Sequence, residues 1–164
     1  MDRLWAPWRI KYIETGNVDG CIFCVKPGQG EENDAANFII HRGEHAFVLL
    51  NLYPYIGGHT MIAPYKHTGN LEDLSDAEML ELFSLVRRVM ATLKKVFNPD
   101  GFNVGMNIGE AAGAGFGDHI HVHVVPRWAQ DTNFMPVLTD TRVISESMEE
   151  TYERLEKAWK SPTE

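Results

Sequence analysis

The sequence predicts an α+β fold in which helices cover a mainly antiparallel sheet. Short runs typical of β-strands follow one another through the middle of the chain, one long amphipathic helix interrupts them, and a second follows the last strand. The chain has 164 residues, which suits one domain with its own hydrophobic core. We expect a single domain over 1–164, with an N-terminal arm at 1–20 and a C-terminal extension with a helix at 129–164.

The N-terminal arm carries Trp5 and Trp8 on either side of Pro7. Such an aromatic cluster needs a surface to bury against, either the core of this chain or a partner subunit. The stretch "KPGQGEENDAAN" (26–37) is expected to be a loop, because Gly, Pro, Asn and acidic residues dominate it.

Two short strands are expected on either side of the turn "YPYIGG". The first covers "HAFVLLN" (45–51), and the second covers "HTMIAP" (59–64), where Pro64 ends it. They are expected to pair as a hairpin-like unit. Two further strands, "GFNVGMNIG" (101–109) and "HIHVHVVPRW" (119–128), flank the glycine-rich loop "EAAGAGFGD".

The segment "LSDAEMLELFSLVRRVMATLKKVF" (74–97) is the clearest helix. Ser75 and Glu78 fit a capping box with Ser75 at the N-cap, and Asn98-Pro99 ends the helix. Its apolar residues form one stripe that is expected to cover a sheet: Met79, Leu82, Phe83, Val86, Val89, Met90, Leu93, Val96 and Phe97. A final amphipathic helix is expected from roughly Ser145 to Lys160, with Met148, Tyr152, Leu155 and Trp159 on its apolar face.

Composition and charge exclude several classes of function. The net charge of −8 disfavours nonspecific binding to nucleic acid through the overall field. The chain contains no run of 18 apolar residues, so no transmembrane helix is expected. Charges interrupt the start "MDRLWAPWRIKYI", which is unlike a signal peptide, and we expect a cytoplasmic protein.

The two cysteines of the chain, Cys21 and Cys24, form the motif "CIFC". In a reducing compartment such a pair is more often a metal clamp or a redox pair than a structural disulfide.

The stretch "GDHIHVHVVPRW" (117–128) contains the histidines from which a function can be predicted. Side chains two residues apart in a strand lie on the same face of the sheet, about 6.5–7 Å from each other, so His119, His121 and His123 form a row. The alternate residues are expected to face the opposite way, into the core under the long helix: Ile120, Val122 and Val124. A merely solvated strand face normally carries Thr, Lys or Glu, which makes three histidines improbable there.

Two functional interpretations fit the histidine row. The first is a metal site built from all three imidazoles. The second is nucleophilic catalysis at phosphorus, in which an imidazole attacks and nearby donors neutralise the charge on the oxygens. The loop "GEAAGAGFG" just before the row favours the second, because Gly113, Gly115 and Gly117 let backbone N–H groups approach phosphate oxygens closely.

The motif "HIHVHVV" matches the His-φ-His-φ-His-φ-φ signature, and the sequence resembles the histidine triad (HIT) family of nucleotide hydrolases and transferases. The segments "LNLYPYIGGHTMIAPYKHTGNLEDL" and "MNIGEAAG" resemble the family's upstream regions, so the resemblance runs from about Cys21 to Trp128. "RLWAPWRIKYI" and "PRWAQDTNFM" are most similar to the fragile-histidine-triad-like branch of diadenosine polyphosphate hydrolases and phosphorylases. The resemblance implies a HIT-like domain, a nucleotide substrate and a homodimer.

The resemblance also implies a mechanism. His121 matches the nucleophile that attacks the α-phosphorus and forms a nucleotidyl-histidine intermediate. His123 matches a residue that binds and polarises the phosphate, and His59 in "GGHT" matches a further histidine near the nucleophile. Either of these two is expected to protonate the leaving group. Water then gives hydrolysis, and inorganic phosphate gives phosphorolysis.

Six positions are candidates for binding the substrate. Asn51 matches a residue that contacts the ribose or phosphate region, while Asn107 stands where the fragile-histidine-triad branch has glutamine. The loop is one residue longer than in that branch, so its phosphate-contacting positions are left open. The other candidates are two loop glycines and two residues of the base pocket: Gly113, Gly115, Leu49 and Met61.

For the cysteine pair, the resemblance implies a structural zinc. The matching ligands are Cys21, Cys24, His67 in "PYKHTGNL", and His119, which leave no coordination position open for water. A redox pair and a pair of free thiols are the alternatives, but no thioredoxin-like βαβ pattern surrounds the motif. No motif position claims His41 and His45, which are expected at the surface or at a strand edge.

Three other functions stay open from the sequence: a nucleoside phosphoramidate hydrolase, a nucleotide-binding adaptor with little turnover, and a zinc-stabilised interaction module. An adaptor has no need of a nucleophile, so the intact His121 favours an enzyme.

Overall fold

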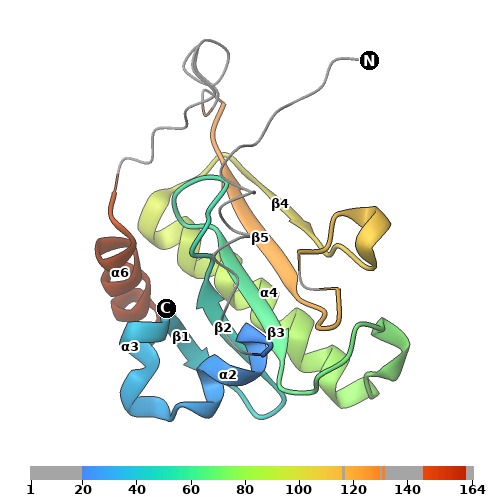
Figure 1. Cartoon of the computed structure of the whole chain (residues 1–164). Helices are drawn as coiled ribbons and strands as arrows, with labels where there is room; N and C mark the ends of the chain where they lie inside the picture. The colour runs from blue at the N-terminus through green and yellow to red at the C-terminus, as the bar shows by residue number, and fades with distance from the viewer. Residues whose placement is uncertain (1–19, 116, 130, 132–145, 162–164) are drawn as a thin grey trace.

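The computed structural model describes residues 20–115, 117–129, 131 and 146–161 (Figure 1). The expected N-terminal arm, with Trp5 and Trp8, lies outside these residues. In chain order the elements are α2 (Ile22–Gly28), η1 (Glu31–Asn33), α3 (Asp34–Asn37), β1 (Ile39–Arg42), β2 (Ala46–Leu50), β3 (Thr60–Pro64), η2 (Leu71–Asp73), α4 (Asp76–Phe97), β4 (Gly101–Gly105), η3 (Glu110–Ala112), β5 (Val122–Arg127) and α6 (Met148–Lys160).

The strands form one five-stranded sheet in the order β1-β2-β3-β5-β4, and every neighbouring pair is antiparallel. The predicted α+β class with an antiparallel sheet is therefore confirmed. The predicted hairpin-like pairing of β2 with β3 is confirmed as well, with Val48 opposite Ile62. β5 is inserted between β3 and β4, so that His123 lies opposite Met61 of β3.

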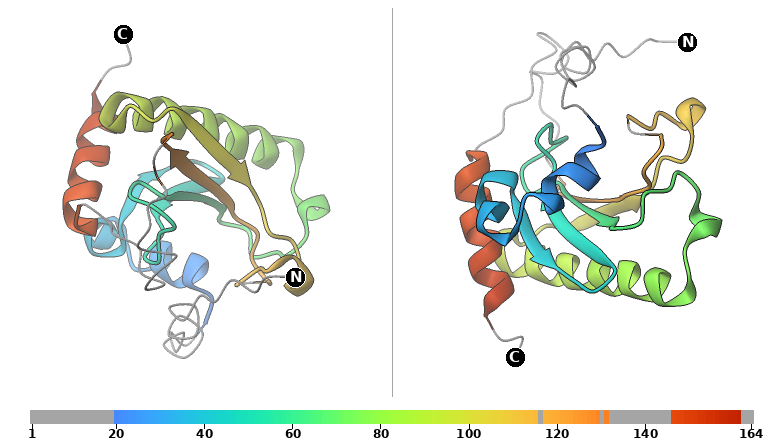
Figure 2. Two further views of the ribbon diagram at one scale, coloured as in Figure 1. Left: turned by 90° about the horizontal axis from the view of Figure 1, so that it is seen from above. Right: turned by 60° about the horizontal axis from the view of Figure 1, so that its bottom comes forward.

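The long helix α4 and the short helix α2 lie on opposite faces of the sheet (Figure 2, left). α4 packs against β2, β3 and β5, while α6 packs against α4 and the edge strand β1. The hydroxyl of Tyr152 in α6 donates a hydrogen bond to the backbone oxygen of Ile39 (3.2 Å). The guanidinium of Arg88 in α4 lies 4.0 Å from the ring centroid of Trp159.

The main core lies between α4 and the sheet, as the apolar stripe predicted. From α4 it takes Leu82, Leu85, Val86, Val89 and Leu93, and from the other side Ile62, Ile120, Val122 and Val124. Phe83 was wrongly placed in the stripe. Its side chain is exposed, because it lies next to Leu82 on the helix and therefore points away from the sheet.

The predicted capping box at the start of α4 is confirmed. The N–H of Glu78 donates to the Ser75 hydroxyl oxygen (3.3 Å), and the N–H of Ser75 donates to the Glu78 carboxylate (2.7 Å). Ser147 and Glu150 repeat this box at α6, which confirms the predicted final helix and starts it at Met148.

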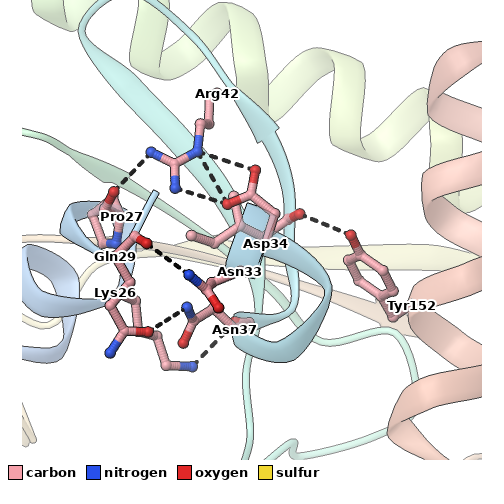
Figure 3. Close-up of polar contacts among 9 residues, drawn as sticks. Lys26, Pro27, Gln29, Asn33, Asp34, Asn37, Arg42 and Tyr152 are labelled. Atoms are coloured by element: carbon pink, nitrogen blue, oxygen red, sulfur yellow. Dashed lines mark hydrogen bonds and ion pairs between the residues drawn. The ribbon is translucent and has the colours of Figure 1, made fainter. Parts of the chain in front are cut away.

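The stretch predicted as a loop over 26–37 is instead mostly helical, which corrects the sequence prediction. α2 extends to Gly28, and η1 and α3 follow it. Figure 3 shows the reason: Lys26 Nζ donates to the Asn37 backbone oxygen (3.2 Å), and Arg42 Nη1 donates to the Pro27 backbone oxygen (2.9 Å). Tertiary hydrogen bonds of this kind override the loop-like composition.

Three strand assignments also differ from the sequence prediction. β1 was not predicted, β4 ends at Gly105 rather than at 109, and β5 begins at Val122 rather than at 119. The segment before β5 leaves the sheet because the N–H of Ile120 donates to the Thr68 backbone oxygen (2.8 Å), in the loop after β3. Among the described residues, no helix is long and apolar enough to span a membrane.

Candidate functional site

The predicted row of histidines lies on the face of the sheet that α2 covers. His119 and His121 precede β5 and His123 lies within it, while Val122 and Val124 point to the α4 core. Two of its members are buried, with His119 at 0% and His121 at 6% exposure, while His123 is half-buried. A second, smaller core lies beside it, made of Phe23, Ile39, Phe47, Leu49, Met61 and Ala63.

A backbone hydrogen bond fixes the tautomer of His121. Its Nδ1 lies 2.9 Å from the backbone oxygen of His119, which can only accept, so Nδ1 carries the proton. The lone pair of the ring is then on Nε2. Burial also lowers the pKa of His121, which keeps the imidazole neutral. A neutral ring with a fixed lone pair is what a nucleophile requires.

A second hydrogen-bonded chain fixes the tautomers of His59 and His123. The backbone N–H of Tyr55 donates to Nδ1 of His59 (3.1 Å), so the proton of His59 is on Nε2. That Nε2–H donates to Nδ1 of His123 (3.0 Å), which leaves the proton of His123 on its own Nε2. His123 therefore keeps one N–H that its neighbour does not use.

His59 is held in place by the turn before it. Gly58 has a φ of +81°, and a Cβ at this position would come within 3.2 Å of Leu93 and Phe97. The glycine of the "GGHT" motif therefore lets the chain approach α4 closely and directs His59 to the other side. The N–H of Asn51 donates to the backbone oxygen of His59 (3.0 Å), which joins the two ends of the turn between β2 and β3.

Burial keeps this pair of imidazoles neutral. Burial, followed by the neighbouring His123 and His121, lowers the pKa of His59 to about 3. Burial and His121 lower the pKa of His123 to about 4. His59 is 1% exposed and its only ring N–H is donated to His123, so it is poorly placed to protonate a leaving group. Of the two predicted proton donors, the geometry favours His123.

The four predicted metal ligands gather in one place. Their ligand atoms lie within 4.8 Å of one another, although α2, the loop after β3 and the segment before β5 contribute them: Cys21, Cys24, His67 and His119. Nε2 of His119 lies 2.8 Å from the Pro64 backbone oxygen, so this nitrogen carries the proton and Nδ1 has the lone pair. Such an outer hydrogen bond orients an imidazole toward a metal.

The spacing of the cluster fits a tetrahedral metal. Nδ1 of His119 lies 3.3 Å from Sγ of Cys21 and 3.6 Å from Sγ of Cys24. Nδ1 of His67 lies 3.2 Å from Nδ1 of His119. In a tetrahedral site with bonds of about 2.1 Å to nitrogen and about 2.3 Å to sulfur, ligand atoms lie roughly 3.4–3.8 Å apart. The donor set therefore can hold a metal with small adjustments, and four protein ligands would close its coordination.

The two asparagines predicted to bind the substrate have different neighbours in the structure. Asn51 Nδ2 lies 3.4 Å from His59, and the Asn51 side-chain oxygen accepts from the Tyr53 N–H (2.9 Å). Asn107 Nδ2 donates to the Gly113 oxygen (3.4 Å), which helps to close the glycine-rich loop.

The loop glycines and the predicted base-pocket residues lie at different depths in the structure. Gly113 adopts a φ of +84°, and its N–H donates to the Glu110 oxygen (2.9 Å), so the loop itself uses this donor. Gly115 is exposed. Leu49 and Met61 lie on the histidine face but are 0% and 5% exposed, within the small core.

Two residues at the site were missed by sequence reasoning. The backbone of Tyr55 sets the tautomer of His59, and the ring of Phe23 packs against His121 with centroids 4.5 Å apart. The available signals were weak: Tyr55 belongs to the turn before "GGHT", and Phe23 lies between the two cysteines. The predictions for His41 and His45 agree with the structure, because His41 is on the edge strand β1 and the side chain of His45 is 35% exposed.

Comparison with known proteins identifies one family. The family model of the HIT domain matches residues 32–130. The AP-4-A phosphorylase of Mycobacterium tuberculosis is 36% identical over 165 residues, which cover 97% of this chain and 85% of the relative. The asymmetrical bis(5'-nucleosyl)-tetraphosphatase of Schizosaccharomyces pombe is 33% identical, over 57% of this chain and 50% of the relative.

Solved structures show the same similarity. The crystal structure of a zinc-bound histidine triad family protein from Mycobacterium smegmatis has a TM-score of 0.66 and 27% identity. The match covers 85% of this chain and 93% of that one.

Proposed function

Because this chain belongs to the HIT family, we propose that it is an enzyme that cleaves a dinucleoside polyphosphate through a nucleotidyl-histidine intermediate on His121. The observation that carries the proposal is the fixed lone pair on Nε2 of a buried, neutral His121. A buried imidazole that serves only packing has no need of a defined free lone pair.

In the first step, Nε2 of His121 attacks the α-phosphorus, and an N–P bond forms as the P–O bond to the leaving polyphosphate breaks. The N–H of His123 that His59 does not use is the donor we assign to the phosphate oxygens or the leaving oxygen. His59 acts through His123, because its own Nε2–H is donated to that ring.

In the second step, an oxygen nucleophile attacks the same phosphorus and the N–P bond breaks, which restores Nε2 of His121. Inorganic phosphate as the nucleophile makes the reaction phosphorolysis, and water makes it hydrolysis. We favour diadenosine tetraphosphate and phosphorolysis, because the AP-4-A phosphorylase relative covers 97% of this chain while the tetraphosphatase relative covers 57%.

Around the nucleophile, we propose Asn51, Asn107 and the loop at Gly113 and Gly115 for the ribose and phosphates. Leu49 and Met61 support the base side of the site from the small core. Apolar walls of this kind select a base only weakly.

For the metal cluster we propose a structural zinc. The support is its two-cysteine, two-histidine donor set, the spacing of its ligand atoms and the zinc named for the Mycobacterium smegmatis relative. The metal would hold α2 against the segment that carries His119, whose backbone oxygen orients His121. Thiols available for zinc fit the reducing cytoplasm that we propose as the location.

We propose that residues 1–164 form a single domain and that two copies of the chain form a homodimer. The strand β4 is at the edge of the sheet and pairs on its outer side with no other described strand. Its residue Val104 is 43% exposed, and a second copy of such an edge would supply the missing strand partner.

Incubation of the purified protein with diadenosine tetraphosphate, with and without inorganic phosphate, tests the reaction. ATP and ADP formed only with phosphate are the expected products. ATP and AMP formed without phosphate would make the protein a hydrolase instead. If diadenosine tetraphosphate and an adenosine phosphoramidate both survive, the enzyme proposal is wrong and a nucleotide-binding adaptor takes its place.

Metal analysis of protein purified without added metal tests the zinc. About one equivalent of zinc per chain is expected, and Cys24→Ser should lose most of it, because one of four ligands is removed. Zinc well below half an equivalent in the parent protein would contradict the site.

A further inference from the structure

We infer that Phe23 is a positioning residue for the nucleophile: its ring fixes the plane of the His121 imidazole. This inference rests on the proposed function. The two ring centroids are 4.5 Å apart with an interplanar angle of 30°. Phe23 is 1% exposed and His121 is 6% exposed, so the protein covers this contact on most sides. The same ring lies 5.2 Å from the ring of His119, which belongs to the metal cluster.

His121 needs such a contact because its hydrogen bond alone does not fix the ring. The bond from Nδ1 to the His119 oxygen sets the tautomer, but the imidazole can still tilt about it. The ring of His123 meets His121 at 75° with centroids 4.8 Å apart. Phe23, at a much smaller angle, limits a different direction of tilt. Attack in line on phosphorus requires the Nε2 lone pair to keep its direction.

Phe23 can act as a support because α2 is held on both sides of it. Cys21 and Cys24, on either side of Phe23, belong to the metal cluster. Toward the end of the helix, Arg42 donates to the Pro27 oxygen (2.9 Å) and forms an ion pair with Asp34 (2.7 Å), as Figure 3 shows. The hydrogen bond from Arg42 to Pro27 holds α2 whether or not a metal is bound. The helix can therefore keep the Phe23 ring in a fixed position.

A positioning role predicts a specific kinetic effect. Loss of the ring should slow the formation of the N–P bond, because the lone pair is misdirected in part of the molecules. The affinity for the nucleotide should change little, since the predicted binding contacts involve other residues.

Phe47 offers a matched control. It is 0% exposed, belongs to the same small core as Phe23 and packs its ring against Tyr65 with centroids 5.3 Å apart. Phe23→Leu and Phe47→Leu remove the same side-chain volume from one core, so both should cost similar stability. Phe23→Met is a second variant that keeps more of the volume without a ring.

The experiment compares these variants in single-turnover kinetics, in the KM for diadenosine tetraphosphate and in zinc content. It also records the ¹⁵N NMR signals of the His121 ring. We expect Phe23→Leu and Phe23→Met to slow nucleotidyl-histidine formation about tenfold or more, with KM within about twofold. The His121 ring signals should shift or broaden, with full zinc in each protein. Phe47→Leu should leave the rate and the ring signals close to the parent.

Equal changes in the Phe23 and Phe47 variants would overturn the inference and leave the proposed function standing. Unchanged ring signals and rates in both Phe23 variants would overturn it as well. If the parent protein forms no nucleotidyl-histidine, the proposed function fails, and the NMR comparison still decides whether Phe23 orients the His121 ring.

Discussion

The two faces of the sheet are built on different physical principles. The α4 face is held by aliphatic packing, with residues such as Leu82, Leu93 and Ile62 at 0% exposure. The α2 face carries the histidines, and each buried imidazole there has a defined hydrogen-bond partner. His119 donates to Pro64, His121 to His119, and His59 to His123.

The difference shows how the fold separates stability from chemistry. A packed aliphatic face tolerates small rearrangements, because its contacts have no direction. The histidine face depends on which nitrogen carries each proton, so a single lost donor changes the chemistry of its neighbour. Substitutions on the α4 face should therefore change mainly the free energy of unfolding, and those of the histidines on the α2 face mainly the rate.

The largest effect is expected for His121→Asn. Loss of the nucleophile should lower kcat by about 10⁴-fold or more, because the covalent intermediate cannot form. The midpoint of thermal unfolding and the affinity for nucleotide should stay close to the parent. Steady-state kinetics, thermal unfolding and nucleotide titration measure these quantities. A rate close to that of the parent would place the nucleophile elsewhere.

Leu82→Ala tests the other face. Leu82 is 0% exposed in the main core, so its truncation should lower the free energy of unfolding by about 2–5 kcal/mol. Below the unfolding transition kcat should change less than about twofold, because the tautomers on the opposite face are unaffected. Chemical denaturation and kinetics at low temperature check this. A large loss of kcat in folded protein would break the division between the faces.

His59→Asn should lower kcat by about 10²-fold without removing a group that touches the substrate. The variant loses the Nε2–H that holds the tautomer of His123. The ring of His123 is then free to carry its proton on either nitrogen. Kinetics test this, with Leu82→Ala as a control for reduced stability. An equal loss of kcat in both variants would mean that His59 serves stability alone.

The pH dependence of stability sharpens the comparison further. The pKa of His59 falls to about 3 in the folded protein, so the unfolded chain takes up this proton near pH 6.5 and the folded protein does not. The free energy of unfolding should therefore fall as the pH drops from about 6.5 toward 3. The contribution of His59 is about 1.4 kcal/mol per pH unit.

Denaturation at pH 8 and pH 5 measures this contribution. Between pH 8 and pH 5, the free energy of unfolding should fall less in His59→Asn than in the parent. Between pH 7.5 and 8.5, His59 should add no pH dependence to the stability of the parent. An equal loss of stability between pH 8 and pH 5 in both proteins would contradict a neutral, buried His59.

The same division explains what the sequence could predict. Periodicity predicted α4, its cap at Ser75 and the inward direction of Val122 and Val124, because packing and capping are local or periodic signals. The family resemblance predicted which two cysteines and two histidines come together beside the histidine row. It did not predict that 26–37 is mostly helical, because this stretch has the composition of a loop and is held by distant partners such as Arg42.

The roles within the site were even less predictable from sequence. The family resemblance predicted His59 as one of two candidate proton donors. The structure shows its Nε2–H donated to His123, which depends on a backbone N–H from the preceding turn, at Tyr55. Phe23 carried no signal beyond its place between two cysteines. Tautomers and ring contacts depend on tertiary geometry that periodicity does not encode.

Rapid base-quench of a single turnover with diadenosine tetraphosphate, followed by peptide mass spectrometry without exposure to acid, tests the covalent mechanism most directly, because the N–P bond is labile in acid and stable in base. A nucleotidyl group on His121 that appears and decays at the rate of product formation is the result we expect. Product that accumulates at full rate with no nucleotide on His121 at any time would contradict the account.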